Sequence, residues 1–211
     1  MKHQKGKFAD ISFTPADVEQ WTPDLSIGQG FRCTRGEFVT FWKQGRILRD
    51  VTSCLCACWI LRNQHDLAGY ITLFADKLTV TEAEEPLLVA ENVPYESFPA
   101  VKIGLLATDA RTRGVGKCLI LWAISFVAIE IAPQLGVRFM TVDALFDPDS
   151  GYDISDFYRK FGFQYANPQE VLPPIEGFRT MYFDMLSLIR ELAALAQLPS
   201  GAENNTVHGD C

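Results

Sequence analysis

The chain has 211 residues, of which 48% are hydrophobic and 21% are charged, the composition of one globular domain with an ordinary core. It carries 19 Lys and Arg residues against 26 Asp and Glu residues, a formal charge of −7 at pH 7. This acidic balance argues against nucleic-acid binding driven by the overall charge, although it does not exclude a local basic groove.

The first ten residues carry three lysines but lack the apolar stretch of a secretory signal. The longest apolar run, Cys118 to Ile129, is shorter than the roughly 20 residues that span a bilayer. We therefore expect a cytoplasmic protein that does not contact a membrane.

Two short helices are expected in the amino-terminal part. Residues 8 to 13 predict a first strand, and residues 14 to 17 then have the order Thr-Pro-Ala-Asp, which suits a helix start and predicts a helix to about Trp21. A capping-box spacing from Thr34 to Glu37, ahead of large apolar residues, predicts a second helix over about 35–48.

From Val51 the hydrophobic period changes to two, which indicates strands. Residues 53–61 and 67–80 predict two strands joined by a polar turn at 63–66. Cys54, Cys56 and Cys58 would then share one strand face, where cysteine behaves as a small hydrophobe. The six cysteines form no C-x-x-C pair, so the sequence predicts no metal site.

An acidic connection follows over residues 81–99, with five glutamates and three prolines. Such a long loop is often functional in a compact domain and could favour a cationic ligand, and a solvated linker is the alternative interpretation. A strand is predicted at 100–107.

The remaining elements are a helix at 115–132, a buried strand at 139–145, a short helix at 153–161, a strand at 178–185 and a helix at 185–197. The helix at 115–132 is apolar on nearly all sides, so its second face needs cover from the last helix or from a second subunit. We therefore divide the chain into a domain (1–185), a docking helix (186–198) and a disordered tail (199–211).

The turn at Arg111–Lys117 is the most informative segment, because it joins a predicted strand to the apolar helix. A glycine-bearing turn at a helix start presents unpaired backbone N–H groups and the positive end of the helix dipole, which together hold phosphate. A close helix–strand contact without a ligand would explain the G-x-G nearly as well. The segment matches neither the Rossmann fingerprint nor a Walker loop.

The order of elements and several motifs resemble the GNAT N-acetyltransferase superfamily. The matching segments are VKIGLLATDARTRGVGK at 101–117, RFMTVDAL at 138–145 and DFYRKFGF at 156–163, with GYITLFAD at 69–76, FPAVKIG at 98–104 and MYFDM at 181–185. They are similar to a bacterial branch near the acetyltransferase toxins. The resemblance implies an α/β fold with a mixed central sheet of about six to seven strands, splayed into a V-shaped opening and flanked by helices.

The resemblance also implies that acetyl-coenzyme A binds in this opening, between the strand ending at Ala107 and the strand around Thr141. The pantetheine amides would pair with the backbone of Leu106, Ala107 and Thr108. The diphosphate would rest on the turn formed by Arg111, Thr112, Arg113, Gly114, Val115, Gly116 and Lys117, with Arg111, Gly114 and Gly116 at the motif positions.

Tyr158 occupies the place where members of the family often keep a general acid. A phenol with an ordinary pKa near 10 stays protonated at neutral pH and can protonate a departing thiolate. The alternative is a core aromatic residue with a hydrated hydroxyl group. Two segments differ from the usual pattern of the family. The link at 109–114 is shorter, and the segment 146–153 is longer and could shape the acceptor pocket.

The reaction also needs a proton acceptor for the attacking amine. The candidates are acidic residues and one histidine, and the sequence does not choose among them: Asp76, Glu91, Asp109, Asp143 and His65.

Three functions follow from these considerations. The first is acetyl transfer to a primary amine of a small molecule or a protein by direct attack, without a metal. The second is a toxin that acetylates aminoacyl-tRNA, against which the charge of −7 counts. The third is a non-catalytic acyl-coenzyme A binding module. The oligomeric state, including a homodimer, is left open.

Overall fold

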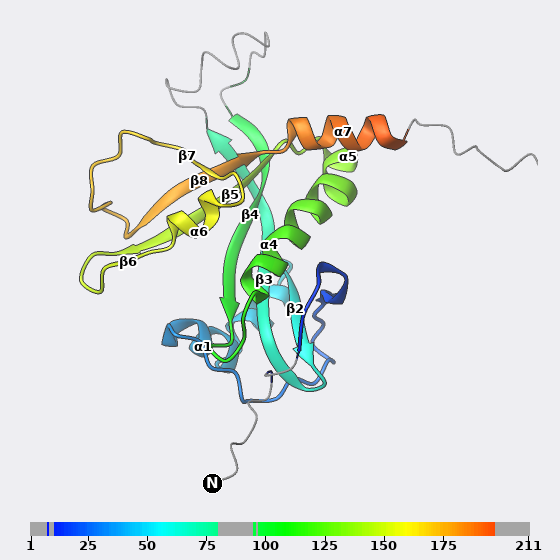
Figure 1. Ribbon diagram of the computed structural model, residues 1–211, viewed down its shortest axis with the longest axis vertical. Helices are drawn as coiled ribbons and strands as arrows, with labels where there is room; N and C mark the ends of the chain where they lie inside the picture. Colours follow the sequence, from blue (N-terminus) through cyan, green and yellow to red (C-terminus); the bar gives the residue numbers. More distant parts are fainter. Residues whose placement is uncertain (1–7, 9–10, 80–94, 96, 197–211) are drawn as a thin grey trace, which may run out of the picture.

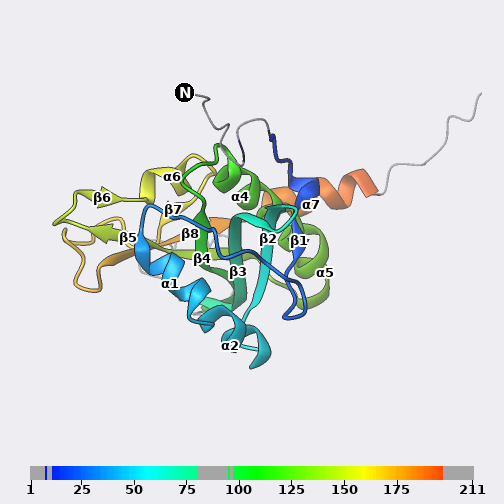
Figure 2. The ribbon, with the colours of Figure 1, turned by 90° about the horizontal axis from the view of Figure 1, so that it is seen from below.

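Eight strands form one mixed sheet with helices on both faces (Figures 1 and 2). The computed structural model describes residues 8, 11–79, 95 and 97–196. The strands are β1 (Glu19–Gln20), β2 (Ala57–Asn63), β3 (Asp66–Thr79), β4 (Ser97–Thr108), β5 (Phe139–Asp147), β6 (Tyr152–Asp153), β7 (Gln164–Tyr165) and β8 (Phe178–Asp184). Their order is β1-β2-β3-β4-β5-β8-β7, and β6 pairs with β5 outside this path.

Within this sheet only β4 and β5 pair in parallel, as far as the described residues extend. A parallel pair needs a crossover, and here the crossover is helical. The helices are η1 (Pro15–Asp17), α1 (Gly36–Lys43), α2 (Arg46–Thr52), α4 (Val115–Phe126), η2 (Val127–Ile131), α5 (Ala132–Leu135), α6 (Ser155–Arg159) and α7 (Leu186–Ala196). The run α4–η2–α5 connects β4 to β5.

The main core lies between the sheet and α4. Leu119, Ile120 and Ala123 of α4 are completely buried, and they belong to one cluster with Ile71 of β3 and Met140 of β5. A second cluster covers the opposite face of β2 and β3, where Ile47 of α2 packs with Phe31 and Tyr70. The two clusters explain why β2 and β3 are apolar on both faces.

The predicted helix at 115–132 is longer than expected and irregular. After α4 the chain forms a π-helical turn, η2, and continues through α5 to Leu135. Pro133 lacks the N–H that a regular helix would use, which accounts for the change of hydrogen-bonding pattern near it. The 21 residues Val115–Leu135 could span a membrane by length and composition, because their most apolar 18-residue window has a mean hydropathy of 2.0, but half of that window is buried inside the domain.

The second face of this helical run receives α7. Leu188, Ile189 and Leu192 of α7 pack against the main core, and α7 contacts η2. In Figure 1, α7 lies beside α5. This arrangement covers the apolar side that the sequence left without a partner.

Several predicted boundaries were wrong. Residues 11–13 form no strand, and the helix predicted to reach Trp21 is one turn, η1, followed by β1. Its predicted start is present, since the N–H and hydroxyl groups of Thr14 both donate to Asp17. The helix predicted at 35–48 is divided at Gly45, whose φ of 72° interrupts the first helix.

The prediction for the cysteines was also wrong in part. Cys54 has a φ of 56° and lies exposed before β2 begins, because the strand starts only at Ala57. Cys56 is partly buried, and Cys58 alone of the three is fully buried. Within the described ranges, no three His, Cys, Asp or Glu side chains are grouped to hold a metal ion. Most of the acidic connection at 81–99 lies outside the described residues.

Candidate functional site

The two parallel strands part in the middle of the sheet. Their pairing ends at Ile103 and Val142. Beyond this point β4 pairs only with β3, whereas β5 pairs with β8 and, at Phe146 and Asp147, with β6. The backbone of β4 beyond this point, through Leu106 to Thr108, therefore borders an opening between the strands. The V-shaped opening expected from the resemblance is present.

A bulge in β4 marks the vertex of the opening. Opposite Thr72 of β3, β4 has two residues, Gly104 and Leu105, and the Leu105 N–H donates to the Thr72 hydroxyl at 2.9 Å. A Cβ atom on Gly104 would lie 2.5 Å from Cε1 of Phe74 and 2.9 Å from the same hydroxyl. The bulge therefore requires glycine at position 104.

Asp109 organises the turn between β4 and α4. Its buried carboxylate accepts hydrogen bonds from the Arg32 N–H at 2.9 Å, the Arg111 N–H at 2.9 Å and the Arg111 guanidinium at 2.7 Å. Burial by itself raises the pKa of this carboxyl, but the hydrogen bonds from Arg111 and Arg32 outweigh burial and lower the pKa below its usual value. Asp109 therefore stays ionised, and both of its carboxylate oxygens already accept hydrogen bonds. This makes Asp109 unsuitable as a general base.

The side chain of the motif residue Arg111 also bonds to groups within the protein. Besides Asp109, its guanidinium donates to the Gly30 carbonyl at 2.8 Å and lies 5.4 Å from the centre of the Phe8 ring. Arg111 thus fixes the turn from within. Arg113 and Lys117, by contrast, are exposed and form no ion pair with any residue that the structure describes.

Unpaired donors gather at the start of α4. The Cys118 N–H makes the first helical hydrogen bond, to the Gly114 carbonyl at 3.0 Å. The five preceding N–H groups, from Arg113 to Lys117, find no acceptor among the described residues. Gly114 has a φ of 76°, which glycine adopts without strain. Unpaired N–H groups at a helix start can hold an anion, so the geometry at this turn is compatible with the predicted phosphate site.

Phe157 of α6 reaches the same place. A Cβ atom on Gly116 would lie 3.3 Å from Cζ of Phe157 and 3.6 Å from Cγ2 of Thr108. The first turn of α4, the end of β4 and α6 therefore meet around Gly116, and the structure brings the predicted coenzyme residues together at one end of the opening.

Tyr158 follows Phe157 and is 6% exposed. Its ring packs edge-on against Phe157 and Phe163, with ring centres 5.3 and 5.7 Å apart. Burial raises the pKa of its phenol above the ordinary value, so that the group is protonated at neutral pH. Its hydroxyl group makes no hydrogen bond with the residues the structure describes.

A pocket of about 450 Å³ lies on the face of the sheet that carries α2. Its floor is formed where β4 and β5 part, by Gly104, Leu105, Lys102 and Asp143. The rim includes Arg46, Arg49 and Asp50 of α2. Lys102 Nζ lies 2.6 Å from Asp143 Oδ2, and the Thr180 hydroxyl donates to Asp143 Oδ1 at 3.0 Å.

The structure separates the candidate bases. Asp143 lines the pocket, whereas Asp76 accepts a 2.5 Å hydrogen bond from the hydroxyl of the buried Thr141. His65 is exposed in the turn between β2 and β3, and Glu91 lies outside the described residues. Lys102 was not among the site residues predicted from the sequence, although a single charge in an otherwise apolar strand was a signal for it.

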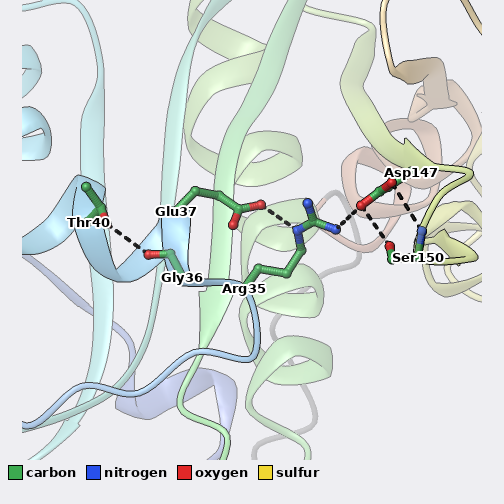
Figure 3. A network of polar contacts seen from close by, with 6 residues as sticks. All are labelled: Arg35, Gly36, Glu37, Thr40, Asp147 and Ser150. Carbon is green, nitrogen blue, oxygen red and sulfur yellow. Dashed lines mark hydrogen bonds and ion pairs between the residues drawn. The ribbon is translucent and has the colours of Figure 1, made fainter.

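The segment 146–153 is tied to α1 by a polar network (Figure 3). The Arg35 guanidinium bonds to Glu37 and, at 3.2 Å, to Asp147 at the end of β5. Asp147 also accepts a 2.7 Å hydrogen bond from the Ser150 hydroxyl group, and the guanidinium carbon of Arg35 lies 4.9 Å from the centre of the Tyr152 ring. This network joins the β5–β6 side of the opening to the helices at β2 and β3.

No family model matches the sequence, and no curated protein is similar to it by sequence. Solved structures do match. AtaT complexed with acetyl-methionyl-tRNAfMet is 20% identical, with a TM-score of 0.65 over 84% of this chain and 98% of that chain. A bacterial toxin is 20% identical, with a TM-score of 0.67 over 88% and 97% of the two chains. A tyrosine-to-phenylalanine variant of KacT is 20% identical, with a TM-score of 0.65 over 83% and 97%. The architecture and these likenesses show that this chain has the GNAT acetyltransferase fold, near that of the toxin-type enzymes.

Proposed function

We propose that this protein is an N-acetyltransferase that moves the acetyl group of acetyl-coenzyme A to a primary amine in a ternary complex. One observation carries the proposal: the five unpaired N–H groups at the start of α4 lie at the same end of the sheet as the open edge of β4. Coenzyme A needs both features, because its diphosphate requires a group of N–H donors and its pantetheine arm requires an open strand edge beside them. A solved structure of AtaTR bound with AcCoA, 23% identical to this chain, supports the choice of coenzyme.

The chain's own groups fit the coenzyme. The N–H groups of Arg113 to Lys117 would hold the diphosphate, helped by the exposed charges of Arg113 and Lys117. The backbone of Leu106, Ala107 and Thr108 would pair with the pantetheine amides along the open edge. Arg111 contributes by fixing the turn through Asp109.

The chemistry follows from the two faces of the opening. A neutral amine entering through the pocket beside α2 attacks the thioester carbon at the vertex, and the carbon–sulfur bond breaks. Tyr158, whose raised pKa keeps it protonated, donates a proton to the departing thiolate and is reprotonated by the proton that the acylated nitrogen loses. Structures of tyrosine-to-phenylalanine variants have been solved for AtaT and KacT, which makes Tyr158 the first residue of this chain to test.

The acceptor is a small-molecule or protein amine in the first form of the proposal. A second candidate is aminoacyl-tRNA, favoured by Arg46 and Arg49, whose side chains are 51% and 68% exposed at the pocket rim. They could meet phosphate groups despite the overall charge of −7. The AtaT structure with acetyl-methionyl-tRNAfMet gives this candidate a precedent in the same fold.

The proposal is tested by incubating the full chain with acetyl-coenzyme A and, separately, polyamines, aminoglycosides, a lysine peptide and aminoacyl-tRNA. Release of free thiol with one acceptor, and an acetylated product found by mass spectrometry, is the expected result. Tight binding of acetyl-coenzyme A without transfer to any acceptor would favour the third function, a non-catalytic binding module.

A further inference from the structure

A lysine lies on the floor of the pocket beside α2, at the vertex of the opening. Lys102 pairs with Thr141 in the last part of the parallel ladder, and Asp143 is the first residue of β5 beyond it. Lys102 Nζ lies 2.6 Å from Asp143 Oδ2, with the two side chains 20% and 28% exposed. The Thr180 hydroxyl holds the other carboxylate oxygen at 3.0 Å. The ammonium group is therefore held in one position.

Lys102 shares the pocket with the residues that border the proposed thioester. Gly104 and Leu105 line the same pocket and form the bulge at the vertex. From Thr108 to Gly104 the strand extends about 13 Å, at about 3.3 Å per residue, so an extended arm anchored at the start of α4 would bring its thioester to this vertex. Gly104 has no side chain that could separate Lys102 from it.

Lys102 is the one primary amine among the residues that line this pocket. The other two cations, Arg46 and Arg49, carry guanidinium groups, which stay protonated and are poor nucleophiles. Asp143 Oδ2 lies within hydrogen-bond distance of this nitrogen, so the carboxylate is placed to relay a proton from it.

We propose that Lys102 is an internal acetyl acceptor, modified by the protein itself from bound acetyl-coenzyme A; this inference rests on the proposed function. Asp143 takes one proton from the Lys102 ammonium, and the neutral nitrogen attacks the thioester carbon. The carbon–nitrogen bond forms and the carbon–sulfur bond breaks. Tyr158 gives its proton to the thiolate and regains one from the second N–H of the nitrogen, and Asp143 releases its proton to water. The products are acetyl-lysine, coenzyme A and one proton.

Acetylation of Lys102 would change what the pocket prefers. Its lining contains three cations, Arg46, Arg49 and Lys102, and two acids, Asp50 and Asp143. Modification removes the cation beside Asp143 and leaves that carboxylate without its ion-pair partner. The floor then attracts a positively charged acceptor amine that the unmodified lysine repels.

The test uses the full chain, freed of prior acetylation by a lysine deacetylase, and acetyl-coenzyme A with an isotope-labelled acetyl group. The position and rate of labelling are measured by peptide mass spectrometry. Lys102 is expected to acquire the label roughly tenfold or more faster than the exposed Lys43 and Lys160, because it is held beside the thioester. Heat-denatured chain, in which all lysines react chemically, is expected to lose this difference.

Two variants sharpen the test. Lys102→Arg keeps the charge and is expected to remove the rapid labelling while Lys43 keeps its slow labelling. Asp143→Asn is expected to slow labelling of Lys102 without changing the affinity for acetyl-coenzyme A, which calorimetry measures and which also shows that the variant is folded.

The outcomes separate the inference from the proposed function. If an added amine is acetylated while Lys102 labels no faster than Lys43, the inference is wrong and the proposed function stands. If acetyl-coenzyme A binds but neither Lys102 nor any added amine is labelled, both are wrong. Labelling of Lys102 at the same rate in the denatured chain would also overturn the inference.

Discussion

The Arg111 guanidinium folds back on Asp109, with Nη2 2.7 Å from Oδ2, and this ion pair closes the turn that precedes α4. The motif arginine thereby acts on the backbone of its own turn. The N–H groups that follow it are left to bind an anion, and their direction depends on the pair.

Asp109→Asn is expected to loosen this turn. A buried acceptor with several donors is replaced by a neutral group, which should cost about 2 kcal/mol of unfolding free energy and weaken acetyl-coenzyme A binding. Because the folded-state pKa of Asp109 is lowered, its contribution is fully present above the unfolded-state pKa and is lost as the pH falls through the folded-state value. Urea unfolding between about pH 2 and pH 6 should therefore show a smaller acid-dependent loss in the variant than in the wild type. Equal pH dependence would contradict this account.

Gly116→Ala is expected to weaken acetyl-coenzyme A binding about tenfold, since one methyl group would lie between the backbone donors and the diphosphate and would press on Phe157 at 3.3 Å. Calorimetry gives the affinity. Gly36→Ala, in which the added Cβ meets no atom within 4 Å, is the matched control and should bind normally.

Tyr158→Phe is expected to reduce the rate of acetyl transfer by about 100-fold or more while leaving acetyl-coenzyme A affinity unchanged. The reason is that only the proton donor is removed, and the ring contacts with Phe157 and Phe163 are kept. Thiol release under saturating substrates measures the effect. An unaffected rate would show that Tyr158 is a core aromatic residue and not the general acid.

Arg46 and Arg49 distinguish the two acceptor classes. Replacing both with Ala should lower activity on aminoacyl-tRNA by about tenfold or more and flatten its dependence on salt, because two phosphate partners are lost. Activity on an uncharged small amine should change little. The same loss for both acceptors would indicate damage to α2 and would remove the support for a tRNA surface.

Removal of α7 by ending the chain after Met185 tests the cover over η2. Leu188, Ile189 and Leu192 would leave the core, so a lower melting temperature and loss of solubility are expected. Light scattering of the full chain measures its mass in the same buffer. A stable monomer, combined with a truncated chain that remains soluble and equally stable, would show that this face needs neither α7 nor a second subunit.

Periodicity and capping residues determined most of the elements in this chain. The long strands β3, β4, β5 and β8 and the helices α4 and α7 have hydrophobic patterns that depend only on local sequence. The start of η1 was also readable, because Thr14 and Asp17 bond within four residues. The two-residue strands β1, β6 and β7 were missed, since two residues contain no period.

The sequence by itself determined the glycine turn and the helix behind it, because both depend on residues close together in the chain. Only the tertiary structure decided what the charged groups do. Asp109 was one of five candidate bases until Arg32 and Arg111 were found around it, and Lys102 met Asp143 only because β4 pairs with β5. The pKa of a buried acidic group depends on the donors and charges around it in space. For Asp109 these neighbours lie up to 77 residues away along the chain.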